Sequence, residues 1–152
     1  MTNYQATVKW QRNSDDFLAN KYSRCHEWVF DGGAVVLASA SPDIVPSPWS
    51  VEARVDPEEA FVASISSCHM LFFLSIACRS GFQVESYADE AVGEMTRNEV
   101  GKYVVSKVSL NPVVNYSGEA LPNHDDIESM HHEAHAECFI ANSIRTKVEV
   151  NL

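Results

Sequence analysis

The N-terminal part of the chain has the hydrophobic pattern of three short strands. Apolar and polar side chains alternate from Tyr4 to Trp10, which is typical of a half-buried strand. A second strand is predicted from Arg24 to Phe30, and the Asp31-Gly32-Gly33 sequence behind it is a hairpin-turn signal. Ala34 to Ala38 then forms the returning strand. The opening therefore predicts a three-stranded meander.

A long apolar helix is predicted next. Asp56 can cap its first turn, Pro57 suits the first helical position, and Gly81 supplies a C-terminal stop. Apolar residues recur at helical spacing around most of its circumference, which indicates a buried helix. The stretch from Ala60 to Cys78 is long enough to cross a membrane, but its four serines and one histidine favour a core helix wrapped by protein.

The second half of the chain alternates strands with one more helix. Two long strands are predicted at Val84–Arg97 and Tyr103–Tyr116, joined by a turn at Asn98–Gly101. A last helix begins near Asn123, and Ile144–Val150 alternates again and closes the sheet. The order of elements is therefore βββ-α-ββ-α-β, which is an α+β fold.

Length and charge narrow the class of protein. The 152 residues fit one domain, residues 1–152, with a real core. With 21 acidic and 11 basic residues the net charge is −10, which argues against binding to nucleic acid or to anionic lipid. The N-terminal residues show no secretory pattern, so we expect a cytoplasmic protein whose substrate is a small molecule.

Four cysteines carry the candidate chemistry. No Cys-x-x-Cys occurs, so any redox pair must be brought together by the fold. Cys68 lies on the long helix, and Cys138 continues an apolar stripe of the last helix, which predicts that Cys138 faces the core. Since burial disfavours a thiolate, each of them could equally be a small packing residue. Cys25 and Cys78 are most simply packing residues.

Two segments resemble the signature motifs of one family. The run from Asp56 to Cys68 is similar to the signature helix of the OsmC/Ohr family, the osmotically inducible and organic hydroperoxide resistance proteins. The run from His135 to Asn142 is similar to that family's second motif. The resemblance covers nearly the whole chain and agrees with the order of elements. It implies an OsmC-like fold with a central buried helix and an intertwined homodimer.

The resemblance also implies an activity and its residues. Cys68 would be the peroxidatic cysteine that reduces an organic hydroperoxide, and Cys138 the resolving cysteine that forms a disulfide with it. An external dithiol, of the lipoyl type in this family, would restore both thiols, and no metal or bound cofactor is expected. Glu58 matches the family's helix-start glutamate by its spacing to Cys68. Arg24 is our choice for the arginine that the glutamate holds beside the thiolate, with Arg12 as the alternative.

The position of Glu58 favours a dimer. Ten residues of one straight helix separate Glu58 from Cys68 by about 15 Å and by a rotation of roughly 80°. Glu58 cannot touch the cysteine of its own chain. If it belongs to the site, it reaches the cysteine of a partner subunit, so we expect a symmetric dimer with sites at its interface.

This chain also departs from the family pattern. Phe139 follows Cys138 where many relatives have proline, and His69 follows Cys68. We therefore expect an OsmC-like subgroup with its own pocket. Three phenylalanines of the long helix, together with a tryptophan ahead of it, predict an apolar lining that favours bulky hydroperoxides over hydrogen peroxide: Phe61, Phe72, Phe73 and Trp49.

Other interpretations stay open from the sequence. His131, His132, His135 and Cys138 have spacings at which a metal could be held, although they also fit an exposed, partly acidic helix face. His69 points about 100° away from Cys68 on the helix, so it is poorly placed as a base for acyl transfer. A binding protein of the same fold with little peroxidase activity is the alternative function.

Overall fold

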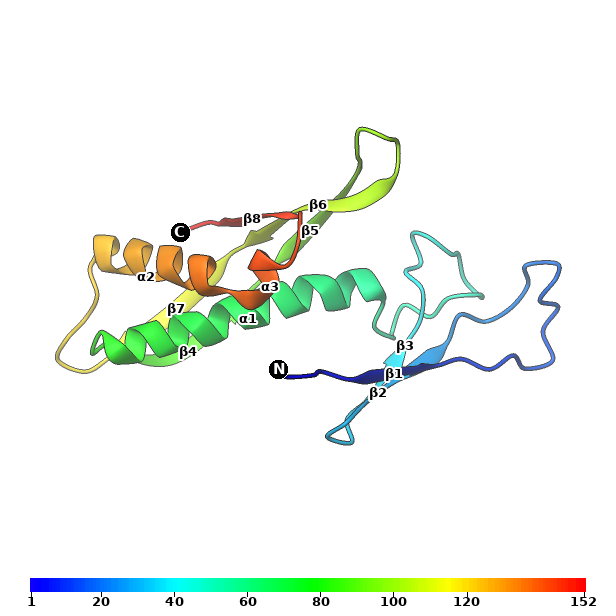
Figure 1. Ribbon diagram of the computed structural model, residues 1–152, viewed down its shortest axis with the longest axis horizontal. Helices are drawn as coiled ribbons and strands as arrows, with labels where there is room; N and C mark the ends of the chain where they lie inside the picture. The colour runs from blue at the N-terminus through cyan, green and yellow to red at the C-terminus, as the bar shows by residue number, and fades with distance from the viewer. The chain divides into compact units, whose positions relative to one another are not determined.

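The computed structural model describes all residues from 1 to 152, which fall into two compact units. The first unit contains Met1–Ala60 and the second Phe61–Leu152. Figure 1 shows the elements of each unit along the chain. The expectation of one domain over residues 1–152 stays a prediction.

The first unit contains the expected meander. Strands β1 (Ala6–Lys9), β2 (His26–Phe30) and β3 (Val35–Ala38) pair antiparallel in the order β1-β2-β3. The hairpin between β2 and β3 turns at Gly33, whose φ of 88° a glycine adopts without steric cost. The three-stranded prediction is confirmed, with each strand shorter than the alternating pattern.

Helix α1 (Pro57–Arg79) begins and ends at the residues that the sequence predicted. The N–H of Glu59 donates to Asp56 Oδ1 at 2.8 Å, and the Asp56 N–H donates to Glu59 Oε2 at 3.2 Å, which forms a capping box. At the other end Gly81 has a φ of 83°. Its N–H bonds to the carbonyl of Cys78, and this left-handed cap terminates the helix.

The second unit divides the two long predicted strands into four. The strands are β4 (Gln83–Asp89), β5 (Val92–Arg97), β6 (Tyr103–Leu110) and β7 (Pro112–Ser117). β4 pairs with β7, and β5 with β6.

Asp89 and Asn111 hold the bend between these two pairs. The Asn111 N–H donates to Asp89 Oδ1 at 2.6 Å, and Asn111 Nδ2 donates to the carbonyl of Glu90 at 2.8 Å. The prediction of two unbroken strands was therefore wrong at its middle. These side chains pair with one backbone donor and one backbone acceptor where the strand ladder is interrupted.

The C-terminal helix ends one residue before the predicted cysteine. Helix α2 (His124–Glu137) starts at Asn123, which forms a capping box with Asp126. Cys138 has extended backbone angles and caps both the end of α2 and the start of the short helix α3 (Phe139–Asn142). The expected helical stripe thus stops before Cys138, because its ψ of 113° breaks the helix there.

Strand β8 (Lys147–Val150) adds to β6 in parallel and completes the order β5-β6-β8. A parallel neighbour requires a crossover, and the segment with α2 and α3 provides it. The second unit has two apolar cores. One contains Phe73, Ile76, Ala77, Met130 and Ala134, and the other contains Ile65, Val108 and Leu110.

Helix α1 contributes to both cores. It is the one helix that is long and apolar enough to cross a membrane. Ile65 belongs to one core and Phe73 to the other, while Leu71 on the opposite side is exposed. α1 is therefore a core helix of the second unit, although it is not wrapped on all sides as the sequence predicted.

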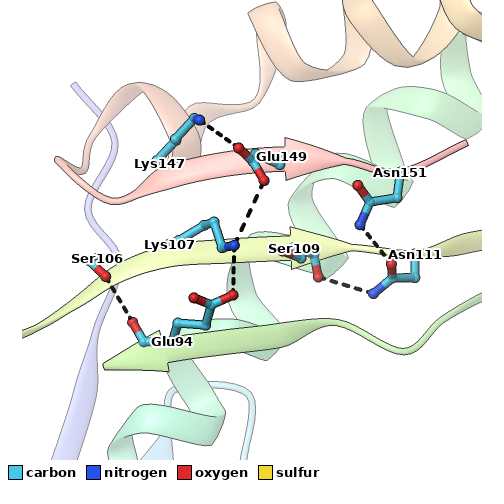
Figure 2. A network of polar contacts seen from close by, with 8 residues as sticks. All are labelled: Glu94, Ser106, Lys107, Ser109, Asn111, Lys147, Glu149 and Asn151. Carbon is cyan, nitrogen blue, oxygen red and sulfur yellow. Dashed lines mark hydrogen bonds and ion pairs between the residues drawn. The ribbon is translucent and has the colours of Figure 1, made fainter. Parts of the chain in front are cut away.

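The outward face of the β5-β6-β8 sheet is polar, as Figure 2 shows. Lys107 on β6 lies 2.7 Å from Glu94 on β5 and 4.0 Å from Glu149 on β8, so one cation bridges three strands. Asn151 Nδ2 donates to Asn111 Oδ1 at 2.9 Å at the end of the same network. Polar and apolar side chains alternate along these strands, so the apolar face of the sheet packs on the core while the polar face meets solvent.

Candidate active site

The two cysteines of the sequence motifs lie next to each other in the second unit. Cys68 occupies the middle of α1 and is half-buried, whereas Cys138 at the break between α2 and α3 is 1% exposed. The Cys68 thiol lies close enough to Cys138 to raise the pKa of the Cys138 thiol. Both thiols are free. The fold thus brings together two residues that are seventy positions apart in the chain.

The surroundings of Cys138 disfavour its thiolate. Burial raises the pKa of the Cys138 thiol, and the neighbouring Cys68 raises it further. The N–H of Ala141, which donates to Cys138 Sγ at 3.4 Å, opposes this rise. Cys138 therefore stays protonated as a thiol. Cys68 is the more accessible of the two cysteines to a dissolved molecule.

Aromatic side chains adjoin the two cysteines. Phe72 lies one turn after Cys68 on α1, and its ring meets that of Phe139 edge to face at 4.9 Å between centroids. Phe139 is 70% exposed, so it presents an apolar surface directly after Cys138. The expectation that Phe73 lines a substrate site was wrong. Phe73 is fully buried and belongs to the core, because it lies on a different face of α1 from Cys68 and Phe72.

A buried histidine pair involves the same buried face of α1 as Phe73, since His69 lies one turn before Phe73. His69 Nε2 and His131 Nδ1 are 2.9 Å apart, and both rings are almost fully buried. His69 turns away from Cys68 as the helix geometry predicted, and it contacts α2 instead. The expectation of an exposed helix face was wrong for His131. Its position next to Met130 and four residues after Ile127 was the signal for burial.

Arg24 and Glu58 both lie in the first unit and do not pair with each other. The Arg24 guanidinium stacks on the ring of Tyr22 at 3.6 Å, and it donates to Asn20 Oδ1 at 2.7 Å. It forms no ion pair, so its charge is not neutralised by a carboxylate. Glu58 is half-buried in the first turn of α1, and its carboxylate makes no hydrogen bond. Arg12 donates to the carbonyl of Asp15 at 2.8 Å.

The remaining candidates are not gathered into a site. Cys25 lies in the first unit and Cys78 is exposed near the end of α1. No group of three or more His, Cys, Asp or Glu side chains is arranged to hold a metal ion. The expectation that the chain works without a metal or cofactor stays a prediction.

Comparison with known proteins places this geometry in a family. A family model described as OsmC-like protein matches residues 51–152. The structure of an OsmC-like protein of unknown function from Vibrio cholerae is 55% identical, with 99% of each chain covered and a TM-score of 0.98. No curated protein matches the sequence.

More distant solved structures share the fold alone. An organic hydroperoxide resistance protein from Bacillus subtilis is 15% identical, with 99% of this chain and 98% of that chain covered and a TM-score of 0.65. One from Elizabethkingia anophelis is also 15% identical, with 99% and 93% covered and a TM-score of 0.67. The resemblance seen in the sequence and the α+β fold are both confirmed. The chain belongs to the family of OsmC-like proteins.

Proposed function

We propose that this protein is a thiol-dependent peroxidase that reduces organic hydroperoxides through Cys68 and Cys138. The observation that carries the proposal is the proximity of a half-buried thiol to a fully buried one on two different elements, close enough for Cys68 to raise the pKa of Cys138. Membership of the family supports it, because solved relatives bear the name organic hydroperoxide resistance protein.

The chemistry takes three steps. The Cys68 thiolate attacks the terminal oxygen of ROOH, the O–O bond breaks, and the alkoxide takes a proton from solvent to leave as ROH. Cys68 is then a sulfenic acid. The Cys138 sulfur attacks that sulfur, which forms the disulfide and releases water. A dithiol of the lipoyl type then donates two electrons and two protons, which restores both thiols as its own disulfide forms.

The unequal surroundings of the two cysteines suit this division of roles. The first step needs a thiolate that can meet the substrate, and Cys68 is the more accessible of the two. The raised pKa of Cys138 makes it the poorer nucleophile toward peroxide, but a neighbouring sulfenic acid is within its reach. The exposed ring of Phe139 favours substrates with bulky apolar groups.

Charge stabilisation of the Cys68 thiolate is proposed to come from Arg24. Its guanidinium is held by Asn20 and Tyr22 and has no acidic partner within the chain. Glu58 is proposed to hold the arginine in a site that two subunits share, since its carboxylate forms no ion pair or side-chain hydrogen bond within the chain. A homodimer is therefore part of the proposal, and so is a cytoplasmic location, where the four free cysteines would stay reduced.

The proposal is tested by a single turnover. Reduced protein is mixed with one equivalent of tert-butyl hydroperoxide, and its disulfides are mapped by mass spectrometry without reductant. We expect a stoichiometric Cys68–Cys138 disulfide that Cys68→Ser abolishes, while the exposed Cys78→Ser serves as the matched control and leaves it unchanged. Folded protein whose Cys68 stays reduced would exclude a peroxidase and favour the binding-protein alternative.

A further inference from the structure

His69 and His131 make the one buried polar contact between helices α1 and α2. His69 Nε2 lies 2.9 Å from His131 Nδ1, and the two ring planes differ by 3°. Phe73 stacks on the ring of His131 at 4.1 Å between centroids. Both histidines are at most 2% exposed, whereas the other polar contact between the helices, Arg79 with Glu133, lies in solvent.

The same two helices position the two cysteines. His69 directly follows Cys68 on α1, and α2 ends one residue before Cys138. A slide of α2 along α1 would therefore move one thiol relative to the other. Apolar contacts between the helices have no preferred direction, whereas a hydrogen bond between two rings requires one distance and one direction.

We infer that the His69–His131 pair is a positioning device: while neutral it holds Cys138 against Cys68, and its protonation in acid slows closure of the disulfide. The inference rests on the proposed function and adds a control on its second step. In the neutral pair one ring nitrogen donates and the other accepts. Full protonation leaves two N–H donors facing each other in an apolar interior, where the bond cannot persist.

The surroundings keep the pair neutral at ordinary pH. Burial lowers the pKa of His69 from 6.5 to about 4, with His135 adding to the effect and Asp89 opposing it. Burial also lowers the pKa of His131 to about 4, with His69 adding to it. Two titratable side chains act on His69, which are His135 from α2 and Asp89 from β4. Tyr87 of β4 and Tyr116 of β7 pack against the core that contains Phe73, the ring that stacks on His131.

Two kinds of variant separate positioning from packing. His131→Phe and His69→Phe keep a ring in place and remove the hydrogen bond. His131→Asn puts an amide near the former Nδ1, and His69→Gln puts one near the former Nε2. Because an amide offers both a donor and an acceptor, each variant can keep its hydrogen bond when the remaining histidine is protonated. His132 lies beside His131 on the exposed side of α2, and His132→Asn and His132→Phe are the matched controls.

The first measurement is disulfide closure without peroxide. Diamide accepts two electrons and two protons from the Cys68 and Cys138 thiols and becomes a hydrazine as the disulfide forms. At neutral pH we expect the Phe variants to close at least about tenfold more slowly than the unaltered protein, and the amide variants within about threefold of it. As the pH falls toward 4, the rate of His131→Asn relative to the unaltered protein should rise, because only the latter loses its pair.

The second measurement follows peroxide reduction with a sulfenic-acid trap present. The Phe variants should consume tert-butyl hydroperoxide within about threefold of the normal rate and accumulate trapped Cys68. The inference is overturned if the Phe variants, folded by circular dichroism, close as fast as the His132 controls. The inference is also overturned if the diamide closure rate of His131→Asn, divided by that of the unaltered protein, stays constant across pH. This ratio of rates decides the matter if the Phe variants do not fold.

The two proposals fail in different ways. If peroxide leaves Cys68 reduced in every protein, the proposed function is wrong, and the diamide rates still decide whether the histidines position the thiols. If peroxide is reduced normally and the diamide rates ignore the histidines, the peroxidase stands and the positioning role is wrong.

Discussion

A β-carbon added to Gly93 on β5 would lie 2.6 Å from Cγ2 of Val62 on α1. That distance is shorter than any real contact, so the helix and the sheet approach each other only because residue 93 has no side chain. Val62 belongs to the surroundings of the core formed by Ile65, Val108 and Leu110. This close approach helps to fix α1, and with it Cys68, against the sheet.

Gly93→Ala should therefore destabilise the second unit. The added methyl group must push Val62 or the strand away, which typically costs about 1–3 kcal/mol. Urea unfolding followed by circular dichroism measures the change. The double variant with Val62→Ala provides the space again, and it should lose less stability than the sum of the two single variants. Equal stability of Gly93→Ala and the unaltered protein would contradict the close packing.

The capping box of α1 should contribute measurably to stability. Asp56→Ala removes the acceptor for the Glu59 N–H, and we expect a loss of about 0.5–2 kcal/mol. Asp56→Asn keeps an acceptor oxygen and should lose much less. Thermal unfolding of the three proteins at one pH measures the difference. If Asn and Ala at this position are equally unstable, the cap is not the reason that Asp56 stabilises the helix.

Stability should fall in acid through the buried histidines. Their pKa values are lowered from 6.5 to about 4, so the unfolded chain binds more protons than the folded one between these values. The stabilisation of the neutral pair is complete above pH 6.5 and is lost as the pH falls toward 4. The loss for one such shift is on the order of 3 kcal/mol.

Comparison with a variant isolates this effect from the carboxylates. Urea unfolding of the unaltered protein and of His131→Asn is measured over the same range of pH. Since the variant has one fewer buried histidine, its stability should decline less as the pH falls. Parallel curves for the two proteins would show that His131 does not titrate as its burial requires.

Loss of the buried thiol should stop the cycle after its first step. Cys138→Ser still has Cys68, so it should consume about one equivalent of hydroperoxide and accumulate sulfenic acid. Its steady-state rate with a dithiol should fall by more than about tenfold. Mass spectrometry of trapped Cys68 and a coupled assay for the dithiol measure the two quantities. Full steady-state activity of Cys138→Ser would exclude a resolving role.

The two candidate arginines can be distinguished by the rate of the first step. Arg24→Ala should lower kcat/KM for an organic hydroperoxide by about a hundredfold, because the cation that we propose for stabilising the thiolate is lost. Arg12→Ala should change it by less than about threefold, since Arg12 bonds only to the carbonyl of Asp15. The reverse order of effects would assign the site to Arg12.

The sequence alone determined the elements whose signals are local. The ends of α1 followed from Asp56, Pro57 and Gly81, and the start of α2 followed from Asn123, because caps and stops act within a few residues. The motif around Cys68 also predicted the family. These features need no knowledge of distant parts of the chain.

Tertiary structure decided the features that depend on long-range contacts. The hydrophobic pattern predicted two continuous strands, and each is interrupted near Asp89 or Asn111. The bond between these two residues joins positions twenty-two residues apart, so a local pattern does not reveal it. The pairing of His69 with His131 spans sixty-two residues, and no periodicity within either helix specifies it. Cys68 and Cys138 are neighbours because α2 breaks at Cys138 and the core packs α1 beside that break. Local patterns place residues on faces, and only packing decides which faces meet.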